Sequence, residues 1–253
     1  YYCTNGSEIM RILITAGGTS EKIDEVRSIT NHSTGKLGSL IAASFLRHDV
    51  TIDYVTTTHA LRPQSDNVTV FEIGDTQELS DQLQKLLQQH TYDAVIHSMA
   101  VSDFTPEKSL SQEEFLTKIN QFIENKQLIT AADLAQLTEA TTRETKISSN
   151  TDQLFLILKK TPKVIQQIKQ LQPNTILVGF KLLVDVEKKE LLAVAQKSLM
   201  TNQADFVLAN DLTSIHHGQH TGYLINKEGT ITGEATSKEE IAQLIVKTLL
   251  NTL

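Results

Sequence analysis

Short runs of β-branched and apolar residues alternate along the chain with longer segments in which apolar residues recur every three or four positions. Arg11–Ala16 is predicted to be a strand, and Lys36–Arg47 a helix with one apolar face. Strands that alternate with helices favour an α/β fold, a doubly wound, mostly parallel, Rossmann-like sheet with helices on both faces. The same patterns predict strands at Thr51–Val55, Val68–Ile73, Ala94–His97, Gln153–Leu158, Thr175–Lys181 and Phe206–Ala209, and helices at Thr76–Gln89 with Thr76 as N-cap, Lys163–Leu171, Val186–Met200 and Ser237–Leu250.

Near the C-terminus the pattern changes to two short strands. Gly222–Asn226 and Thr230–Glu234 are joined around Lys227-Glu228-Gly229, which predicts a C-terminal β-hairpin. No repeat, low-complexity tract or linker divides the chain, so residues 10–253 are predicted to form a single domain.

One long stretch does not fit this alternation. Thr105–Glu144 is polar and rich in Glu, Gln, Thr and Lys, with short amphipathic segments at Glu113–Glu124 and Ala131–Glu139. We interpret residues 105–145 as a flap inserted over a site; a plain surface excursion is the alternative.

The charge balance narrows the range of partners. The 253 residues carry 23 Lys and Arg against 30 Asp and Glu, a formal net charge of −7. Because nucleic acids and anionic membranes are bound by clustered cations, we expect neither as a partner, although a local basic pocket is compatible with an acidic chain. No apolar run approaches the roughly 18–20 residues of a membrane span.

The single cysteine and the start of the chain bear on the compartment. Cys3 stands alone, which excludes a disulfide framework or a cysteine-based zinc site and favours a reducing, cytoplasmic location. Residues 1–9 lack the positive start and apolar core of a signal peptide. Because Met10-Arg11-Ile12-Leu13 is typical of a natural start, we expect residues 1–9 to be an added leader.

Glycines cluster where the first predicted strand ends. Four of the eleven lie between Gly17 and Gly38, and Gly17-Gly18 follows the strand directly. Bare backbone amides at this position can face phosphate oxygens, and a structural turn is the alternative. The dinucleotide fingerprint G-x-G-x-x-G is absent. Gly35-Lys36 does not complete a Walker A loop, because Gly18 lies too far upstream and Leu37 replaces Ser or Thr.

The densest polar cluster, Asn31–Gly38, precedes a predicted helix. In one interpretation Ser33 or Thr34 only caps that helix. In the other, amides, hydroxyls and Lys36 face an anion over the helix N-terminus, while Asn31 hydrogen-bonds a substrate carbonyl or carboxylate without ionising.

Three further charged residues lie near predicted strand ends. Asp103 follows a predicted strand, so it is either a turn former or, in a nucleotide site, a ligand of Mg²⁺ or ribose. Lys146, at the far end of the insertion, and Lys181 are candidate triphosphate contacts, although an isolated lysine is normally only solvated. Since ligands of such sheets lie at the carboxyl ends of strands, several cations there are more suggestive than one.

Neither a metal site nor a protein nucleophile is indicated by the sequence. His216, His217 and His220 lie on a Gly-containing segment without carboxylate or cysteine support, which favours a surface loop over a metal site. There is no G-x-S-x-G elbow and no recognisable nucleophile–base pair. Composition and spacing alone therefore indicate an α/β enzyme that handles a phosphorylated ligand.

A series of motifs, in one order from Met10 to the C-terminus, carries a family resemblance. They are Thr15-Ala16-Gly17-Gly18-Thr19-Ser20-Glu21, Val26-Arg27, Ile29, Asn31-His32-Ser33-Thr34-Gly35-Lys36, Ala100-Val101-Ser102-Asp103-Phe104, Lys146-Ile147-Ser148-Ser149, Gly179-Phe180-Lys181-Leu182 and Ala209-Asn210-Asp211. The chain thus resembles phosphopantothenate–cysteine ligase, also called phosphopantothenoylcysteine synthetase. It is similar to a stand-alone bacterial type, without the flavin-dependent decarboxylase that many bacterial versions carry.

The resemblance implies a two-step ligation in coenzyme A biosynthesis. The carboxylate of 4′-phosphopantothenate attacks the α-phosphate of a nucleoside triphosphate, which gives an acyl-nucleotidylate and pyrophosphate. The amine of L-cysteine then displaces the nucleoside monophosphate to form an amide. No protein nucleophile is needed, but amides, lysines and Mg²⁺ must offset the repulsion of several anionic groups.

The resemblance also implies roles for single residues. Asn31 would bind the carboxylate and polarise the acyl-nucleotidylate carbonyl, and Lys146 would act on the phosphates as the second catalytic residue. The family's active site lies at a homodimer interface, and the segment between Asp103 and Lys146 behaves as a flap. The remaining implied contacts to nucleotide and phosphates, with Asp103 also as the metal ligand, are Gly17, Gly18, Ser33, Gly35, Lys36, Asp103, Phe180, Lys181 and Lys197.

Departures from the family pattern concern the nucleotide. Leu183 stands where eukaryotic members have Glu, and Thr201 where a second lysine is expected after Lys197. Asn31-His32-Ser33 looks bacterial, which favours CTP over ATP as co-substrate. The rival hypotheses are an ATP-using version of the same ligase, a non-catalytic Rossmann-like nucleotide-binding module, and a nicotinamide-dependent reductase, which the missing fingerprint disfavours.

Overall fold

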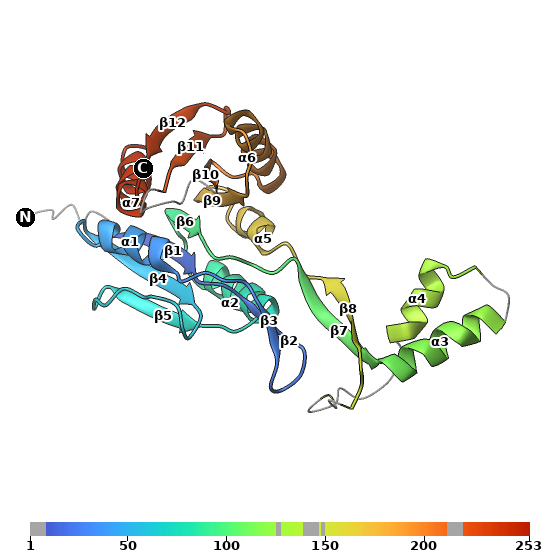
Figure 1. Cartoon of the computed structure of the whole chain (residues 1–253). Coiled ribbons are helices and arrows are strands. Elements are labelled where there is room, and N and C mark those ends of the chain that lie inside the picture. Colours follow the sequence, from blue (N-terminus) through green and yellow to red (C-terminus); the bar gives the residue numbers. More distant parts are fainter. Residues whose placement is uncertain (1–8, 125–127, 139–146, 148–149, 212–219) are drawn as a thin grey trace, which may run out of the picture.

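A computed structural model describes residues 9–124, 128–138, 147, 150–211 and 220–253. Within these residues, eight strands form one sheet in the order β12-β11-β10-β9-β6-β1-β4-β5 (Figure 1). Neighbours from β5 to β10 pair in parallel, and β11 and β12 add an antiparallel hairpin. The strands are β1 (Met10–Ala16), β4 (Val50–Thr56), β5 (Val68–Glu72), β6 (Ala94–His97), β9 (Ile176–Leu183), β10 (Phe206–Asp211), β11 (Gly222–Asn226) and β12 (Ile231–Ala235).

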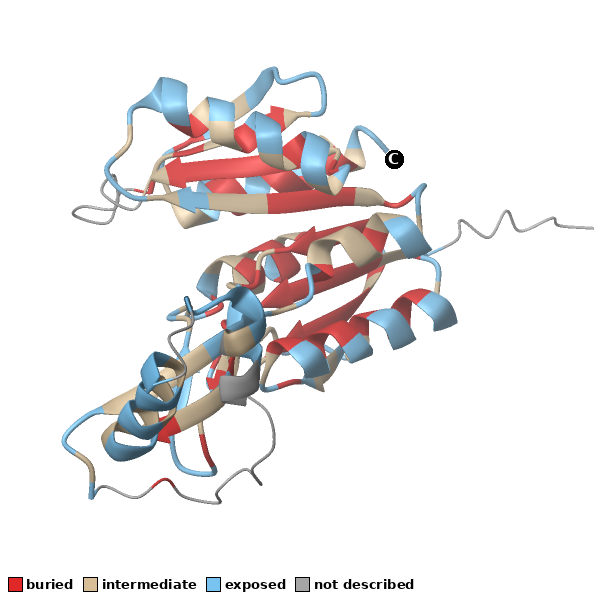
Figure 2. Cartoon of the chain, turned by 90° about the vertical axis from the view of Figure 1, so that its right-hand side faces the viewer, coloured by how far each residue is buried: buried red, intermediate tan, exposed pale blue. Residues whose placement is uncertain are grey.

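Helices cover both faces of this sheet, so the predicted doubly wound fold and C-terminal hairpin are confirmed. On β1, Ile12 and Ile14 face α1 (Lys36–Phe45) and α7 (Lys238–Leu250). Leu13 points the other way, because successive strand side chains alternate, and it joins the core beneath three other helices. Figure 2 shows the buried residues concentrated in the sheet and the inner faces of the helices. The helices on the second face are α2 (Thr76–Gln89), α5 (Val164–Leu171) and α6 (Lys188–Asn202).

The start of α2 differs by one residue from the prediction. Asp75, not Thr76, is the N-cap, because its carboxylate accepts a hydrogen bond from the Glu78 amide at 2.8 Å. The Thr76 hydroxyl instead donates to Glu21 Oε1 at 2.6 Å. Asp75 and Thr76 are both residue types that cap helices, and the hydrogen bond to the buried Glu21 occupies the Thr76 hydroxyl.

A ribbon that the sequence did not predict joins the start of the inserted segment to the strand that follows it. β7 (Phe104–Ser111) and β8 (Leu154–Lys160) pair antiparallel in a sheet of their own, so the strand predicted at Gln153–Leu158 does not belong to the main alternation. α3 (Gln112–Glu124) packs on this ribbon, and α4 (Ala131–Thr138) follows it. Figure 1 shows the ribbon and both helices projecting away from the main sheet, so within one chain they do not cover it.

A second small ribbon, which the sequence analysis does not predict, lies between the Gly17-Gly18 turn and α1. β2 (Ser20–Lys22) pairs with β3 (Ser28–Thr30), with Ser20 opposite Thr30. Strands of three mostly exposed residues carry no alternating apolar signal, which is why the sequence did not predict them.

Candidate active site

The site lies where the winding of the sheet reverses. From β1 the chain builds outward to β4 and β5, and from β6 it builds the other way to β9 and β10. The loops after β1 and β6 leave this point together: the Ala100 amide donates to the Gly17 carbonyl at 2.9 Å, and the Thr19 amide to the Ala100 carbonyl at 3.0 Å. Such a switch point at the carboxyl edge is where open α/β sheets bind ligands.

Two glycines of the site, one in the loop after β1 and one at the start of α1, have a positive φ. Gly17 has φ +96°, and a Cβ there would lie 2.8 Å from Thr57 Oγ1 and 2.9 Å from Ala60 Cβ. Gly35 has φ +70°, and its Cβ would lie 3.0 Å from the same Ala60 and 3.4 Å from the Gly17 nitrogen. The loop after β1 and the start of α1 therefore meet as bare backbone.

The N-terminus of α1 is open toward this backbone. Gly35 is its N-cap, no side chain caps it, and its first turn carries no acidic residue. The alternative that Ser33 or Thr34 serves as the cap is wrong, since the contact from the Lys36 amide to Thr34 Oγ1 is long, at 3.4 Å. The free amides and the helix dipole favour an anion here.

Asn31 lies beside the glycine loop, at the end of β3. Its backbone amide donates to the Thr19 carbonyl at 3.1 Å, and its own carbonyl touches Gly18. Asn31 is half-buried, and within the described part of the chain its side-chain amide has no hydrogen-bond partner. Ser33, also half-buried, follows two residues later on the way to α1. The structure thus places Asn31 and Ser33 between the Gly17-Gly18 loop after β1 and Gly35 at the start of α1.

Phe180 and Lys181 lie on the carboxyl half of β9. The last pair between β6 and β9 is Ile96 with Val178, so β9 continues past its neighbour and leaves these residues half-exposed. Phe180 packs against the core on the α1 side. Lys181 points to the opposite face because strand side chains alternate.

Asp103 is held by a cation that the sequence analysis missed. Lys163 Nζ lies 2.5 Å from Asp103 Oδ1, and both side chains are mostly exposed. Lys163 is the N-cap residue of α5, and only the folding back of the β7–β8 ribbon brings it to Asp103. Among the described residues no group of three His, Cys, Asp or Glu could hold a metal ion. A single carboxylate suits a Mg²⁺ ion that arrives with nucleotide phosphates, so Asp103 as a metal ligand stays a prediction.

The other predicted cations are dispersed. Lys36, at the start of α1, has Nζ 3.6 Å from Glu239 Oε1 of α7, with both side chains about half exposed. Lys197 is exposed on α6 and follows Gln196, whose amide lies against Gly229 in the β11–β12 turn. That turn is at the amino end of β10, so within one chain Lys197 does not join the switch point.

One predicted catalytic residue and two residues of the histidine cluster lie outside the described part of the chain. These are Lys146, the second predicted catalytic residue, and His216 and His217. His220 is described and buried, and its Nε2 lies 3.0 Å from Asn210 Nδ2. Burial lowers the pKa of His220. This contact makes His220 part of the packing at the end of β10.

A buried polar network that the sequence analysis missed supports the switch point. Thr19 Oγ1 donates to Ser102 Oγ at 3.0 Å and accepts from the Ser102 amide at 2.9 Å. Glu21 accepts hydrogen bonds from the amide and the hydroxyl of Thr76, which ties β2 to the start of α2. Only the pairing of segments about 55 to 83 positions apart reveals this network.

His97 ends β6 beneath the site. It is buried, its Nδ1 lies 2.9 Å from Thr15 Oγ1, and burial lowers its pKa to about 4. His97 is therefore neutral at pH 7 and adds no charge to the site. No helix of the described chain is long and apolar enough to cross a membrane.

Comparison with known proteins places this geometry in a family. The family model for the DNA/pantothenate metabolism flavoprotein C-terminal domain matches residues 8–115 and 109–253. A crystal structure described as the DNA/pantothenate metabolism flavoprotein from Streptococcus pneumoniae is 40% identical and covers 96% of this chain and 100% of that one, with a TM-score of 0.84.

Curated relatives are longer. The coenzyme A biosynthesis bifunctional protein CoaBC of Thermococcus kodakarensis is 31% identical over 235 residues, which are 92% of this chain and 49% of that protein. The protein of the same name from Methanocaldococcus jannaschii is 27% identical over 239 residues, 94% and 49% respectively. The chain thus spans about half the length of these relatives. Since the family model covers nearly all of it, the chain belongs to the family of the DNA/pantothenate metabolism flavoprotein C-terminal domain.

Proposed function

We propose that the protein is a phosphopantothenate–cysteine ligase, which joins 4′-phosphopantothenate to L-cysteine in coenzyme A biosynthesis. Relatives named for coenzyme A biosynthesis align with over nine-tenths of the chain, which supports the assignment. The observation that carries it is the half-buried side-chain amide of Asn31, which has no hydrogen-bond partner among the described residues. It lies beside the Gly17-Gly18 backbone and the open N-terminus of α1. A neutral donor next to an anion site suits a substrate that is both a carboxylate and a phosphate ester.

In the first step the substrate carboxylate attacks the α-phosphate of a nucleoside triphosphate. A new C–O–P linkage forms, the bond between the α-phosphate and the bridging oxygen breaks, and pyrophosphate leaves with the electron pair. The uncapped amides of α1 supply fixed positive partial charge without any reorganisation. Lys146 and Lys181 are the cations that we assign to the phosphates in this step.

In the second step the amine of cysteine attacks the activated carbonyl. The developing oxyanion needs a donor, and the Asn31 side-chain N–H is the group that we assign to it. The C–N bond forms, nucleoside monophosphate leaves, and the amine gives its surplus proton to solvent. Asn31 suits this role because its backbone is fixed on both sides, by Thr19 and by Gly18.

For the nucleotide we propose CTP, with ATP as the alternative. Phe180, half-exposed where β9 outruns β6, offers an aromatic edge to a base or ribose. Mg²⁺ would serve as the counter-ion of the nucleotide phosphates, with Asp103 as its candidate protein ligand. Gly17, Gly18, Ser33, Gly35 and Lys36 form the surroundings of the phosphate site in this proposal, and Asp103 is its acidic member.

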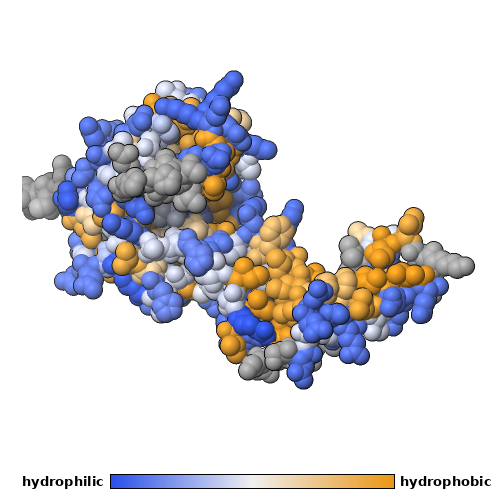
Figure 3. All heavy atoms as spheres, in the orientation of Figure 1, coloured by the Kyte–Doolittle hydropathy of each residue, from blue (hydrophilic) through white to orange (hydrophobic). Residues whose placement is uncertain are grey.

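We further propose that the active form is a homodimer that meets through the β7–β8 ribbon. Leu154–Leu158 is apolar at every position, a pattern of a strand buried on both faces. α3 covers one face, where Phe115 stacks on Phe155 with ring centroids 4.0 Å apart. On the other face Leu158 is 41% exposed and Phe104 is 48% exposed. Figure 3 shows the resulting apolar surface along the ribbon and α3. A second copy, whose own ribbon offers the same apolar row, is the occupant that fits.

The activity is tested by incubating the protein with phosphopantothenate, L-cysteine, Mg²⁺ and either CTP or ATP. We expect pyrophosphate release and a thiol-containing amide product, faster with CTP. Release that needs phosphopantothenate but not cysteine would support the acyl-nucleotidylate. If neither nucleotide yields pyrophosphate, the ligase proposal fails and the non-catalytic nucleotide-binding module takes its place.

A further inference from the structure

Asp24, in the turn between β2 and β3, is the most heavily bonded carboxylate among the described residues. Its side chain is fully buried. Oδ1 accepts the backbone amides of Val26 and Arg27 at 2.9 and 2.7 Å. Oδ2 accepts Arg27 Nε and Nη2 at 3.0 and 2.6 Å. The Arg27 guanidinium is the main reason that the pKa of Asp24 lies far below its usual range.

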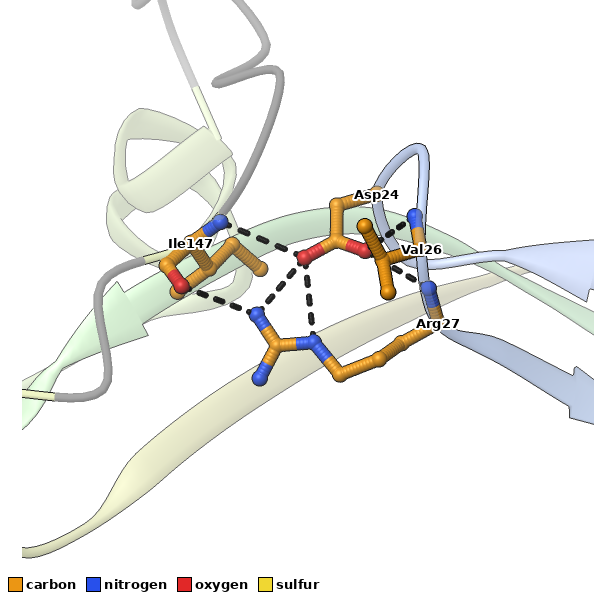
Figure 4. Close-up of polar contacts among 4 residues, drawn as sticks. All are labelled: Asp24, Val26, Arg27 and Ile147. Atoms are coloured by element: carbon orange, nitrogen blue, oxygen red, sulfur yellow. Dashed lines mark hydrogen bonds and ion pairs between the residues drawn. The ribbon is translucent and has the colours of Figure 1, made fainter.

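This ion pair holds the backbone of a residue more than a hundred positions away. The Ile147 amide donates to Asp24 Oδ2 at 3.2 Å, and Arg27 Nη2 donates to the Ile147 carbonyl at 3.0 Å. Figure 4 shows both side chains beside Ile147, where they bind its backbone amide and its backbone carbonyl as a neighbouring strand would. Ile147 itself is buried, with 9% of its surface exposed.

The β2–β3 ribbon, whose turn carries Asp24 and Arg27, ends beside Asn31 of the candidate active site. Arg27 precedes Asn31 by four residues, through β3, and Ser20 pairs with Thr30 at the other end of the ribbon. Four residues of extended chain span at most about 14 Å. Ile147 directly follows Lys146 in the sequence. A short, hydrogen-bonded ribbon therefore connects Asn31 to the residue after Lys146.

We infer that Asp24 and Arg27 are positioning residues of the ligase: by binding both polar backbone groups of Ile147, they hold this residue, which directly follows Lys146 in the sequence, in place relative to Asn31. This inference rests on the proposed function. Both residues are needed, because Arg27 binds the Ile147 carbonyl and Asp24 binds the Ile147 amide. Removal of Arg27 leaves a buried carboxylate without its cation, and removal of Asp24 leaves the Ile147 amide without an acceptor.

The test measures the two half-reactions separately in Asp24→Ala and Arg27→Lys. Lysine keeps the charge but lacks the planar fork that reaches carboxylate and carbonyl together. We expect the rate of pyrophosphate release at saturating substrates to fall about tenfold to a hundredfold in both variants, with little change in KM, because misplacement of a reacting group by about 1 Å costs up to about 10²-fold. Combined with Lys146→Gln, either change should add less than about twofold, since residues that act as a unit are not additive.

Two controls separate this inference from the proposed function. Arg11 and Asp53 form a comparable pair, a buried carboxylate and a partly exposed arginine 3.1 Å apart, on β1 and β4; Arg11→Lys should leave both half-reactions unchanged. Amide exchange of Ile147, which needs no activity, should accelerate in Asp24→Ala and not in Arg11→Lys. Unchanged Ile147 protection in Asp24→Ala, or losses that multiply with that of Lys146→Gln, would overturn the inference. A wild-type protein that releases no pyrophosphate refutes the ligase proposal, whatever the exchange result.

Discussion

Gly18 and Asn31 are in direct backbone contact: a Cβ on Gly18 would lie only 2.1 Å from the Asn31 carbonyl oxygen and 3.5 Å from Asn31 Cβ. The loop after β1 and the end of β3 approach this closely because the Asn31 amide donates to the neighbouring Thr19 carbonyl. The residue assigned to the oxyanion is thus placed by backbone contacts, and a missing side chain makes the approach possible.

Gly18→Ala should displace Asn31 and reduce overall turnover by about 10²-fold, because backbone cannot yield as a flexible side chain can. The measurement is kcat for amide formation, with folding checked by circular dichroism. Gly74→Ala is the matched control, since its nearest neighbour would be the flexible end of Glu78 at 3.3 Å. Equal activity of the two variants would show that the Gly18–Asn31 contact does not matter for catalysis.

Asn31→Asp should separate the two half-reactions. An anionic side chain opposes the oxyanion of the second step, so acyl-nucleotidylate should accumulate while amide formation slows. Rapid quench with labelled nucleotide detects the intermediate. His32→Gln, at an exposed neighbour, provides the comparison. Turnover at the wild-type rate in Asn31→Asp would remove Asn31 from the mechanism.

Lys146→Gln should impair the first step. If its ammonium faces charge that develops on the phosphates, its loss should slow pyrophosphate release by roughly 10²-fold or more. Lys85→Gln, on α2 away from the switch point, is the control. An unaffected rate of release in Lys146→Gln would mean that this lysine is only solvated.

His97 should make stability depend on pH. Its pKa of about 4 in the folded protein lies below the ordinary 6.5, so the unfolded chain binds the extra proton between these values. The free energy of unfolding should therefore fall by about 3 kcal/mol as the pH drops from about 6.5 to about 4, and change no further through this group below that. Urea unfolding of wild type and His97→Gln across this range tests it. The variant should lack this component, whereas His48→Gln, at an exposed position, should retain it.

Leu158→Glu should convert a dimer to a monomer. A charge in the apolar row of the ribbon would have to be buried against the second copy, which costs far more than exposure to water. Light scattering after size exclusion gives the mass, and the same sample gives the activity. Leu171→Glu, at a leucine with 38% of its surface exposed on α5, is the matched control. A wild-type protein that is already monomeric at assay concentration would rule out the ribbon dimer.

The sequence by itself determined the strands and helices of the main sheet. Apolar residues recur every second position in a strand and every three to four positions in a helix, because those are the side chains that each element buries. It also located the glycine loop and the polar run before α1, since bare backbone and capping chemistry are local properties. The family resemblance, confirmed by the family match, came from those same local motifs.

Tertiary structure decided what depends on segments far apart in the chain. Ser33 and Thr34 could each have capped α1, and only the folded loop shows that Gly35 takes that position. The apolar run Leu154–Leu158 is compatible with a central strand and with one half of a ribbon, because the run does not determine which strand pairs with it. The contact of Lys163 with Asp103 and the contacts of Ile147 with Asp24 and Arg27 join segments about 60 to 120 positions apart. Such contacts arise from chain topology, which periodicity along a single chain does not encode.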